Sequence, residues 1–229
     1  TGCNRVHFLN DLQAQGYALD VLDRRHQRAL LPGPEAPGAA TRLVVGIGTG
    51  FNAAPVHRTA QGLFVPPSEC GHIHLPRHDT DEEALAGWLA AQHGLATVEE
   101  ALCGRGLSAI HRHLGHGTAT PEALVEAIAA GAPAARETGA LYAKLLGRVL
   151  ADLALIHLPY GGICLIGGFG SATTDRFSDH FTARQGITLE QQIQAISMRT
   201  PITRVSGHNE YAAKACPGFN VTRWLEGYQ

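Results

Sequence analysis

The sequence predicts an α/β protein, and three observations support this prediction. Two short apolar segments, residues 43–47 and 163–166, are typical of buried strands, and each runs directly into glycines. Other long segments carry apolar residues at helical spacing, and the longest covers residues 134–158. At 229 residues with 45% hydrophobic side chains, the chain can bury a sizeable core, and its order of strands, helices and strand–helix units is typical of this class.

Composition and charge disfavour several classes of partner. The formal net charge of −2 favours neither nucleic acid nor an anionic membrane. No apolar run approaches the roughly 20 residues that span a bilayer. The five cysteines are scattered without C-x-x-C spacing, which is typical of a reducing cytosol, so we expect a cytoplasmic protein. They are Cys3, Cys70, Cys103, Cys164 and Cys216.

The first predicted helix follows a short predicted strand at residues 6–9. Asn10 and Asp11 are good N-cap residues, so the helix should begin there. The apolar side chains behind them recur at helical spacing and give the helix one apolar face. They are Leu12, Ala14, Tyr17, Ala18, Val21 and Leu22.

A loop and several short strands are predicted next. Proline and glycine indicate a loop at residues 32–38. Strands are predicted at residues 43–47, 52–56 and 62–65, and a loop rich in polar side chains follows at residues 66–72.

The middle of the chain is predicted to be helical. Asp79 and the acids after it favour the positive end of a helix dipole, Thr97 is a cap, and Pro121 suits the first turn of a helix. In the longest helix, apolar side chains at i and i+4 form a wide stripe, which is typical of a buried central helix. The predicted helices cover about residues 79–93, 97–102, 107–114, 122–130 and 134–158.

The last part of the chain repeats the strand-to-glycine pattern. The strand at residues 163–166 runs into a glycine turn at residues 167–170, and Ser171 caps a predicted helix. A final strand at residues 202–205 leads to a C-terminal helix from about Glu210.

The glycine turn at residues 46–50, Gly-Ile-Gly-Thr-Gly, has two interpretations. Alternating glycines permit positive φ and close approach of a ligand, and their N–H groups with the Thr49 hydroxyl could hold a phosphate. An ordinary hairpin is equally consistent, because residues 53–56 could form a return strand. Two glycine turns, at residues 46–50 and 167–170, that face one ligand would suit a nucleotide cleft.

Several polar residues have the chemistry of a site. Asp11 follows a strand and could act as a general base, although the local sequence alone favours a plain N-cap. Glu69 and His72, three residues apart, could together bind the hydroxyls of a polyol. Glu99 and Glu100 are, by themselves, ordinary solvated acids at a helix start.

Histidines raise the alternative of a metal site. No cysteine or acid pair completes either local set at a known ligand spacing, so we predict no metal bound by side chains. Most of the thirteen histidines are expected at the surface or hydrogen-bonded in the core. The two sets are His72, His74 and His78, and His111, His113 and His116.

Taken together and in order, these motifs resemble the bacterial glucokinase family, in its branch without the zinc-binding cysteine motif. Five motifs with compatible spacing spread over most of the chain, and their combination is far more specific than any one motif. The resemblance implies the actin-like, ribonuclease-H-related ATPase fold, with ATP and glucose bound between two lobes. The motifs are Leu9-Asn10-Asp11, Gly46-Ile47-Gly48-Thr49-Gly50, Glu69-Cys70-Gly71-His72, residues 98–107 and Ile166-Gly167-Gly168.

The resemblance also implies a role for each matching residue. Asp11 is similar to the base that takes the proton from the glucose 6-hydroxyl. Phosphoryl transfer needs positioning and charge neutralisation more than covalent help, and acids, an amide and an imidazole can supply the hydrogen bonds that a neutral sugar requires. The implied sugar ligands are Asn10, Glu69, His72 and Glu99, and the implied ATP-binding residues are Gly48, Thr49, Gly50, Gly167 and Gly168.

The sequence departs from the family pattern in three places. Cys70 stands where the sugar loop usually has glycine, and Asn52 stands where the phosphate turn usually has a further glycine. The Asp-x-Gly-Gly-Thr loop that normally anchors Mg²⁺ and phosphates is absent. We therefore expect residues 1–11 to be the end of a small lobe or hinge, residues 12–229 to be the large lobe, and about 100 residues to be missing.

These expectations define the predicted activity and its rivals. We predict an ATP- and Mg²⁺-dependent glucose 6-phosphotransferase, with little activity in this chain alone, and a homodimer that binds neither nucleic acid nor membrane. A non-catalytic sugar-binding or regulatory relative is the first alternative. A histidine-rich metalloenzyme is the second.

Overall fold

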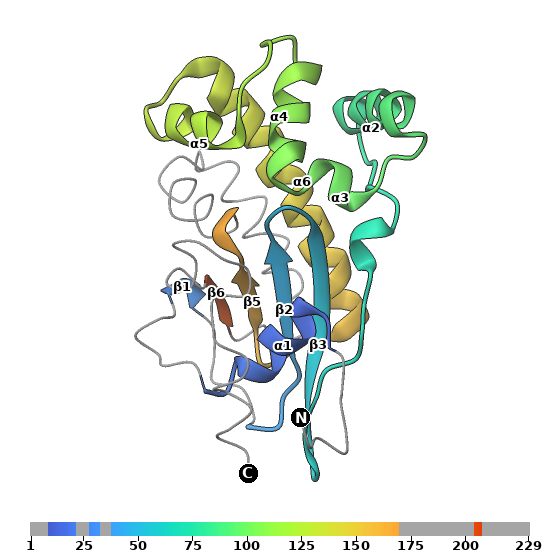
Figure 1. Cartoon of the computed structure of the whole chain (residues 1–229), viewed down its shortest axis with the longest axis vertical. Coiled ribbons are helices and arrows are strands. Elements are labelled where there is room, and N and C mark those ends of the chain that lie inside the picture. The colour runs from blue at the N-terminus through green and yellow to red at the C-terminus, as the bar shows by residue number, and fades with distance from the viewer. Residues whose placement is uncertain (1–8, 22–27, 33–37, 170–203, 208–229) are drawn as a thin grey trace, which may run out of the picture.

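The computed structural model describes residues 9–21, 28–32, 38–169 and 204–207, and its centre is a mixed sheet (Figure 1). The strand order within these residues is β1-β6-β5-β2-β3-β4. The pairs β2–β5 and β5–β6 are parallel, and the other neighbours are antiparallel. The strands are β1 (Arg28–Pro32), β2 (Arg42–Ile47), β3 (Phe51–Thr59), β4 (Gly62–Phe64), β5 (Ile163–Ile166) and β6 (Arg204–Gly207).

Strands β2 and β3 form a hairpin with a three-residue turn at residues 48–50. Their register runs from Arg42 opposite Val56 to Ile47 opposite Phe51. The hairpin interpretation is therefore correct for the backbone. It does not exclude a role in ligand binding, because the carboxyl end of β2 lies beside that of its parallel neighbour β5.

The two faces of the sheet are covered by different helices (Figure 1). Alternate side chains of a strand point to opposite faces, so β2 serves both sides. Val44 packs with Leu12 of α1 (Asp11–Ala18) on one face. Val45 packs on the other face in the larger core, which also includes much of α6 (Pro133–His157). The long central helix of the prediction is thus confirmed as a core element.

The remaining helices cluster beyond the turn of the β2–β3 hairpin (Figure 1). Their caps explain their starts: Asp79, Thr97 and Thr120 each accept a hydrogen bond from the backbone N–H three residues later. The starts predicted at Asp79 and Thr97 are confirmed. These elements are the 3-10 helix η2 (Cys70–His72), α2 (Thr80–His93), α3 (Val98–Ala101), α4 (Gly104–His113) and α5 (Pro121–Ala129).

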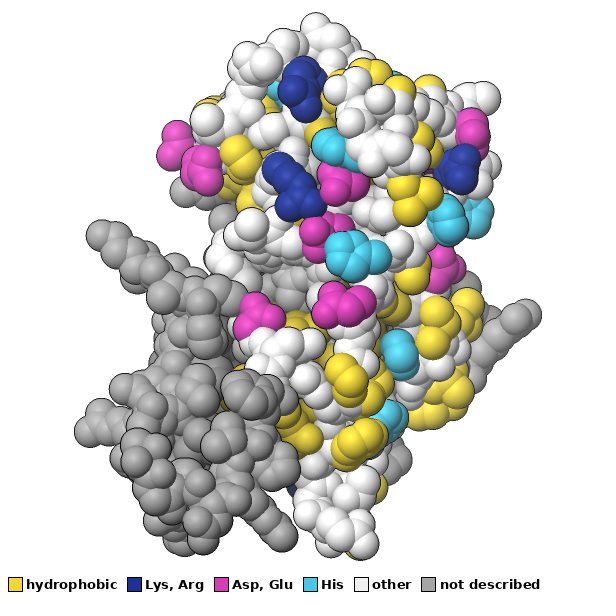
Figure 2. Space-filling view, turned by 45° about the vertical axis from the view of Figure 1, so that its right-hand side comes forward, with side chains coloured by type: hydrophobic (Ala, Val, Ile, Leu, Met, Phe, Trp, Pro, Cys, Tyr) yellow, Lys and Arg dark blue, Asp and Glu magenta, His cyan; other side chains and the backbone are white. Residues whose placement is uncertain are grey.

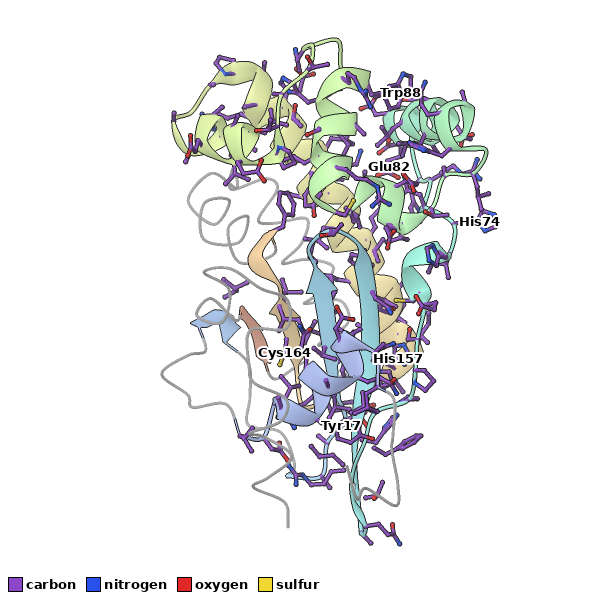
Figure 3. The ribbon with its side chains drawn as sticks, in the orientation of Figure 1. Tyr17, His74, Glu82, Trp88, His157 and Cys164 are labelled. Carbon is purple, nitrogen blue, oxygen red and sulfur yellow. The ribbon has the colours of Figure 1, made fainter. Side chains whose placement is uncertain are left out.

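A buried carboxylate fastens α2 to α6. Glu82 has no exposed surface and lies between α2 and its neighbours (Figure 3). Its carboxylate accepts a hydrogen bond from Arg148 Nε at 2.6 Å and lies 3.4 Å from Lys144 Nζ. It also accepts one from the His78 backbone N–H at 2.7 Å. Because a buried charge is costly unless it is paired, these contacts fix the position of α2.

Parts of the structure differ locally from the predictions. Helix α1 ends at Ala18, because backbone bonds from Leu19 and Val21 reach back only three residues, and the Val21 side chain is 55% exposed. Strand β1 was not predicted, because it depends on pairing with β6 far along the chain. Strand β6 ends at Gly207, two residues after the predicted end at Val205.

Some predictions fall outside the described residues. They concern most of the strand at 6–9, the helix from Ser171 and the helix from Glu210. Among the helices that the structure describes, none is long and apolar enough to cross a membrane.

Candidate functional site

The two predicted glycine turns lie side by side at one edge of the sheet. Gly46 of β2 pairs with Ile166 of β5, so both strands end at the same level. Gly167 has a φ of +103°, and a Cβ there would lie 2.4 Å from the Ile47 carbonyl oxygen. Glycine is therefore required at 167, and the crevice beyond the carboxyl ends of parallel strands is a usual place for ligands in α/β sheets. Gly168 follows and is exposed.

The first turn of α4 holds the tip of the hairpin. The Gly104 N–H donates to the Gly48 carbonyl at 3.0 Å, and Arg105 Nη1 donates to the Thr49 carbonyl at 2.9 Å. A Cβ at Gly48 would meet no atom within 4 Å, so this part of the turn borders open space. The positive end of a helix and a guanidinium thus adjoin the turn that was predicted to hold phosphates.

Glu99 lies directly against this turn. Its Oε2 accepts a hydrogen bond from the Phe51 N–H at 3.1 Å, and its Oε1 accepts one from Arg105 Nη2 at 2.9 Å. A Cβ at Gly50 would lie 2.5 Å from Oε2, so glycine at this position makes room for the carboxylate. Burial alone would raise the pKa of Glu99, but the hydrogen bonds from Arg105 and Phe51, together with His72, outweigh it and lower the pKa.

The predicted sugar loop packs against the start of β3. A Cβ at Gly71 would lie 1.9 Å from the Phe51 carbonyl oxygen, so η2 sits flat on the strand. The His72 N–H donates to the Glu69 carbonyl at 3.1 Å, while both side chains are exposed. The loop therefore places Glu69 and His72 at the surface, with His72 close enough to Glu99 to act on its pKa. Figure 2 shows acidic, basic and histidine side chains adjoining on one face.

Asn52 and Cys70, two of the departures from the family pattern, contact each other. The Asn52 amide donates to the Ser68 carbonyl, and its Oδ1 accepts from the Cys70 N–H at 3.2 Å. The Cys70 thiol lies 3.5 Å from the same oxygen. Burial raises the pKa of this thiol, so it stays protonated and can donate. Asn52 therefore ties the sugar loop to β3, a role that sequence reasoning missed.

Asn10 and Asp11 begin α1. Asn10 is the N-cap, and it exchanges hydrogen bonds with Gln13 in a capping box, so Asp11 is not the cap that the local sequence favoured. Asp11 is exposed, and its Oδ1 accepts from the Leu12 N–H at 2.9 Å. The Gln13 amide donates to the Val65 carbonyl at 2.9 Å, which brings the start of α1 beside the segment that leads to the sugar loop.

Arg105 is the main residue of this region that sequence reasoning did not select. It lies within the segment 98–107 that carried the resemblance, but only its contacts reveal that it joins the hairpin turn to Glu99. A guanidinium six residues after a glutamate was the available signal. By itself it could not distinguish this arrangement from a surface ion pair.

The histidine clusters have other partners. His111 is buried, and its Nδ1 lies 2.8 Å from Thr138 Oγ1. Its pKa is lowered, mainly by burial and in addition by the neighbouring His116. His113 packs against Trp88 instead, with ring centroids 5.7 Å apart. Within the ranges that the structure describes, no group of three or more His, Cys, Asp or Glu side chains could hold a metal ion.

Comparisons with known proteins bear on the family of this chain. The glucokinase family model matches residues 1–206. A glucokinase of Brucella abortus biovar 1 (strain 9-941) is 37% identical over 175 residues, which are 73% of this chain and 50% of the relative. The chain spans about half the length of the curated relatives it matches.

Similarity to solved structures identifies the fold. A crystal structure of a glucokinase from an Antarctic psychrotroph superimposes with a TM-score of 0.69 at 25% identity, covering 87% of this chain and 63% of that one. The glucokinase of Balamuthia mandrillaris in complex with glucose gives 0.73 at 18% identity, covering 93% and 64%. The predicted actin-like sugar-kinase fold is confirmed, and the chain belongs to the glucokinase family.

Proposed function

We propose that this chain is the large lobe of an enzyme that transfers the γ-phosphoryl group of ATP to the 6-hydroxyl of glucose. The observation that carries the proposal is the shared bonding of Glu99 and the hairpin turn. Arg105 bonds both the turn and Glu99, and the Phe51 N–H, which follows the turn, donates to the Glu99 carboxylate. A sugar bound at Glu99 would therefore lie beside phosphates bound at the turn, and such proximity is what phosphoryl transfer requires.

Asp11 is the proposed general base. It is exposed at the first turn of α1, one residue before Leu12, whose side chain packs toward Gly46 near the carboxyl end of β2. A carboxylate there can accept the proton of the attacking hydroxyl. Asn10, Glu69, His72 and Glu99 would supply hydrogen bonds that orient the sugar, and their burial is incomplete, which leaves surface for a ligand.

The glycine turns suit the nucleotide. Gly48 borders open space, and Gly167 allows two backbone segments to approach closely, so phosphates and ribose can meet main-chain atoms. Thr49 adds a hydroxyl, and Gly168, two residues after the end of β5, is exposed. Mg²⁺ would arrive with ATP and neutralise phosphate charge, since this ion keeps several waters and binds few protein ligands.

The assembly and location of the protein are also proposals. We propose a cytoplasmic enzyme, because Cys70, Cys103 and Cys164 are free thiols. A homodimer and the division into residues 1–11 and 12–229 remain predictions. A non-catalytic sugar-binding relative is the alternative, because this chain spans only about half the length of the curated relatives it matches.

The test compares binding with turnover. Calorimetry should detect glucose binding to the 229-residue chain, and isotope-traced glucose 6-phosphate should form slowly or not at all with this chain. A longer protein that adds the small lobe should turn over, and Asp11→Asn should lower its kcat by roughly 10²- to 10⁴-fold while glucose still binds. Asp81→Asn, on the exposed face of α2, is the matched control and should be neutral.

Two outcomes would contradict the proposal. Glucose binding without any turnover in the longer protein would favour the regulatory relative. Full turnover in Asp11→Asn would remove Asp11 from the role of base.

A further inference from the structure

Arg105 makes three charge-assisted contacts from the first turn of α4. Its Nη1 donates to the Thr49 carbonyl at 2.9 Å. Its Nη2 donates to Glu99 Oε1 at 2.9 Å and to Glu100 Oε1 at 3.1 Å. The two ends of one planar group therefore bond the hairpin turn and the acids of α3 at the same time.

The geometry of the guanidinium is essential to this arrangement. Its donors point in fixed directions, so the carbonyl of Thr49 and the carboxylate of Glu99 are held at a set separation. An ammonium group is a point charge on a flexible stem and cannot impose that separation. Because the other oxygen of Glu99 accepts from the Phe51 N–H, both oxygens of the carboxylate are fixed.

The charges around Glu99 come from several elements. Arg105 belongs to α4, His72 to η2 and Glu100 to α3 itself. Glu100 is shared with His93 at the end of α2, 3.4 Å from its Oε2. Arg105 is thus the one described side chain that bonds both acids of α3 and the turn, although its side chain is 48% exposed.

We propose that Arg105 is a positioning residue that couples hexose binding at Glu99 to phosphate binding at the turn 48–50. The inference rests on the proposed function and gives a role to a residue to which the motifs assigned none. A ligand that stabilises the turn also stabilises its bond to Arg105 and, through Arg105, the position of the carboxylate that would receive the sugar. By linkage, the sugar strengthens nucleotide binding by the same factor.

A merely structural ion pair would behave differently. Exposed pairs contribute little to stability. A pair that served stability alone would leave the coupling between two ligands unchanged. The readout must therefore be the coupling between ligands, and not stability or the affinity for one ligand alone.

The experiment measures glucose affinity by calorimetry with and without a non-hydrolysable ATP analogue. In the unmodified protein we expect the analogue to strengthen glucose binding by about 5-fold or more, within the usual range of coupling. In Arg105→Met the factor should fall to about 1. Arg105→Lys should also lose most of it, because a charge without the planar fork does not hold both partners.

Arg112→Met is the matched control. Arg112 lies on the same helix but stacks over Trp88, 5.4 Å from the ring centroid, so the coupling should be unchanged. Retained coupling in Arg105→Met, or full rescue by lysine, would overturn the proposal.

Hydrogen exchange separates this proposal from the proposed function. If the unmodified protein binds neither glucose nor nucleotide, the proposed function fails. The Phe51 amide, which donates to Glu99, still reports on Arg105 without any ligand. Its exchange should accelerate several-fold in Arg105→Met and not in Arg112→Met, and equal exchange in both variants would refute the positioning role.

Discussion

Replacing Asn52 with alanine should release the sugar loop from β3. The change removes the donor to the Ser68 carbonyl and the acceptor of the Cys70 N–H. It also removes the oxygen nearest to the Cys70 thiol. Among the described residues, Asn52 is the side chain that bonds both ends of the segment 68–70.

The expected magnitude follows from the two backbone hydrogen bonds. A partly buried hydrogen bond contributes about 0.5 to 1.5 kcal/mol net, so local opening of the loop should become easier by about 1 to 3 kcal/mol. This corresponds to exchange that is roughly 5- to 150-fold faster. The lower half of the range is expected, because Ser68 Oγ is a second acceptor 3.3 Å from the Cys70 N–H.

Hydrogen exchange with mass spectrometry measures this opening. The peptide that covers residues 68–73 should exchange faster in Asn52→Ala, while the peptide that covers α2 serves as the internal control. Asn52→Asp keeps an acceptor for the Cys70 N–H but loses the donor to the Ser68 carbonyl. Exchange at residues 68–73 in this variant should therefore be faster than in the unmodified protein and slower than in Asn52→Ala.

Two results would refute the reasoning. Unchanged exchange at residues 68–73 would mean that Asn52 does not hold the loop. Equal acceleration in the loop and in α2 would indicate general destabilisation instead of local release.

The remaining predictions concern the loop, the core and acid. Gly71→Ala should cost about 1 to 3 kcal/mol of unfolding free energy and weaken glucose binding, since its Cβ would lie 1.9 Å from the Phe51 carbonyl oxygen of β3. The control Gly87→Ala, which faces open space on α2, should be neutral or stabilising in the same denaturation and binding assays. Glu82→Gln should cost about 1.5 to 3 kcal/mol of unfolding free energy in urea, because it weakens the charge-assisted hydrogen bond that the buried carboxylate accepts from Arg148, while Lys144 and Arg148 keep Asp79 as a partner. The exposed control Glu83→Gln should stay within about 0.5 kcal/mol, and equal values would contradict the assigned role. The pKa of Glu99 is lowered from 4.5 in the folded state, so its contribution to stability is present above that pH and is lost as the pH falls below it through the folded value. Urea unfolding from about pH 6 to about pH 3 should reveal this loss, and a Glu99→Gln variant with the same slope would contradict it.

Much of the helical structure was predictable from the sequence because its causes are local. The caps at Asp79 and Thr97 act on backbone groups three residues away, and the apolar stripe of α6 repeats within one or two turns. Such signals need no knowledge of the rest of the chain. The same holds for the apolar strands β2 and β5, which end in glycines.

The candidate site was predictable as a set of motifs but not as an arrangement. The family resemblance selected Glu99 and the turn 48–50, and the structure brings these together. It could not reveal that Gly50 makes room for the Glu99 carboxylate, because that contact joins residues 49 positions apart. The roles of Asp11 and of the other selected residues stay predictions until ligands are tested.

The sequence by itself determined the α/β class, most element boundaries and the family, because short-range periodicity, caps and ordered motifs encode them. Only the tertiary structure decided that β1 pairs with β6, that Asn52 holds Cys70, and that Arg105 joins the hairpin turn to Glu99. The physical reason is the same in each case. Pairing and side-chain bonding between distant segments depend on how the sheet and helices pack, and no local pattern records that outcome.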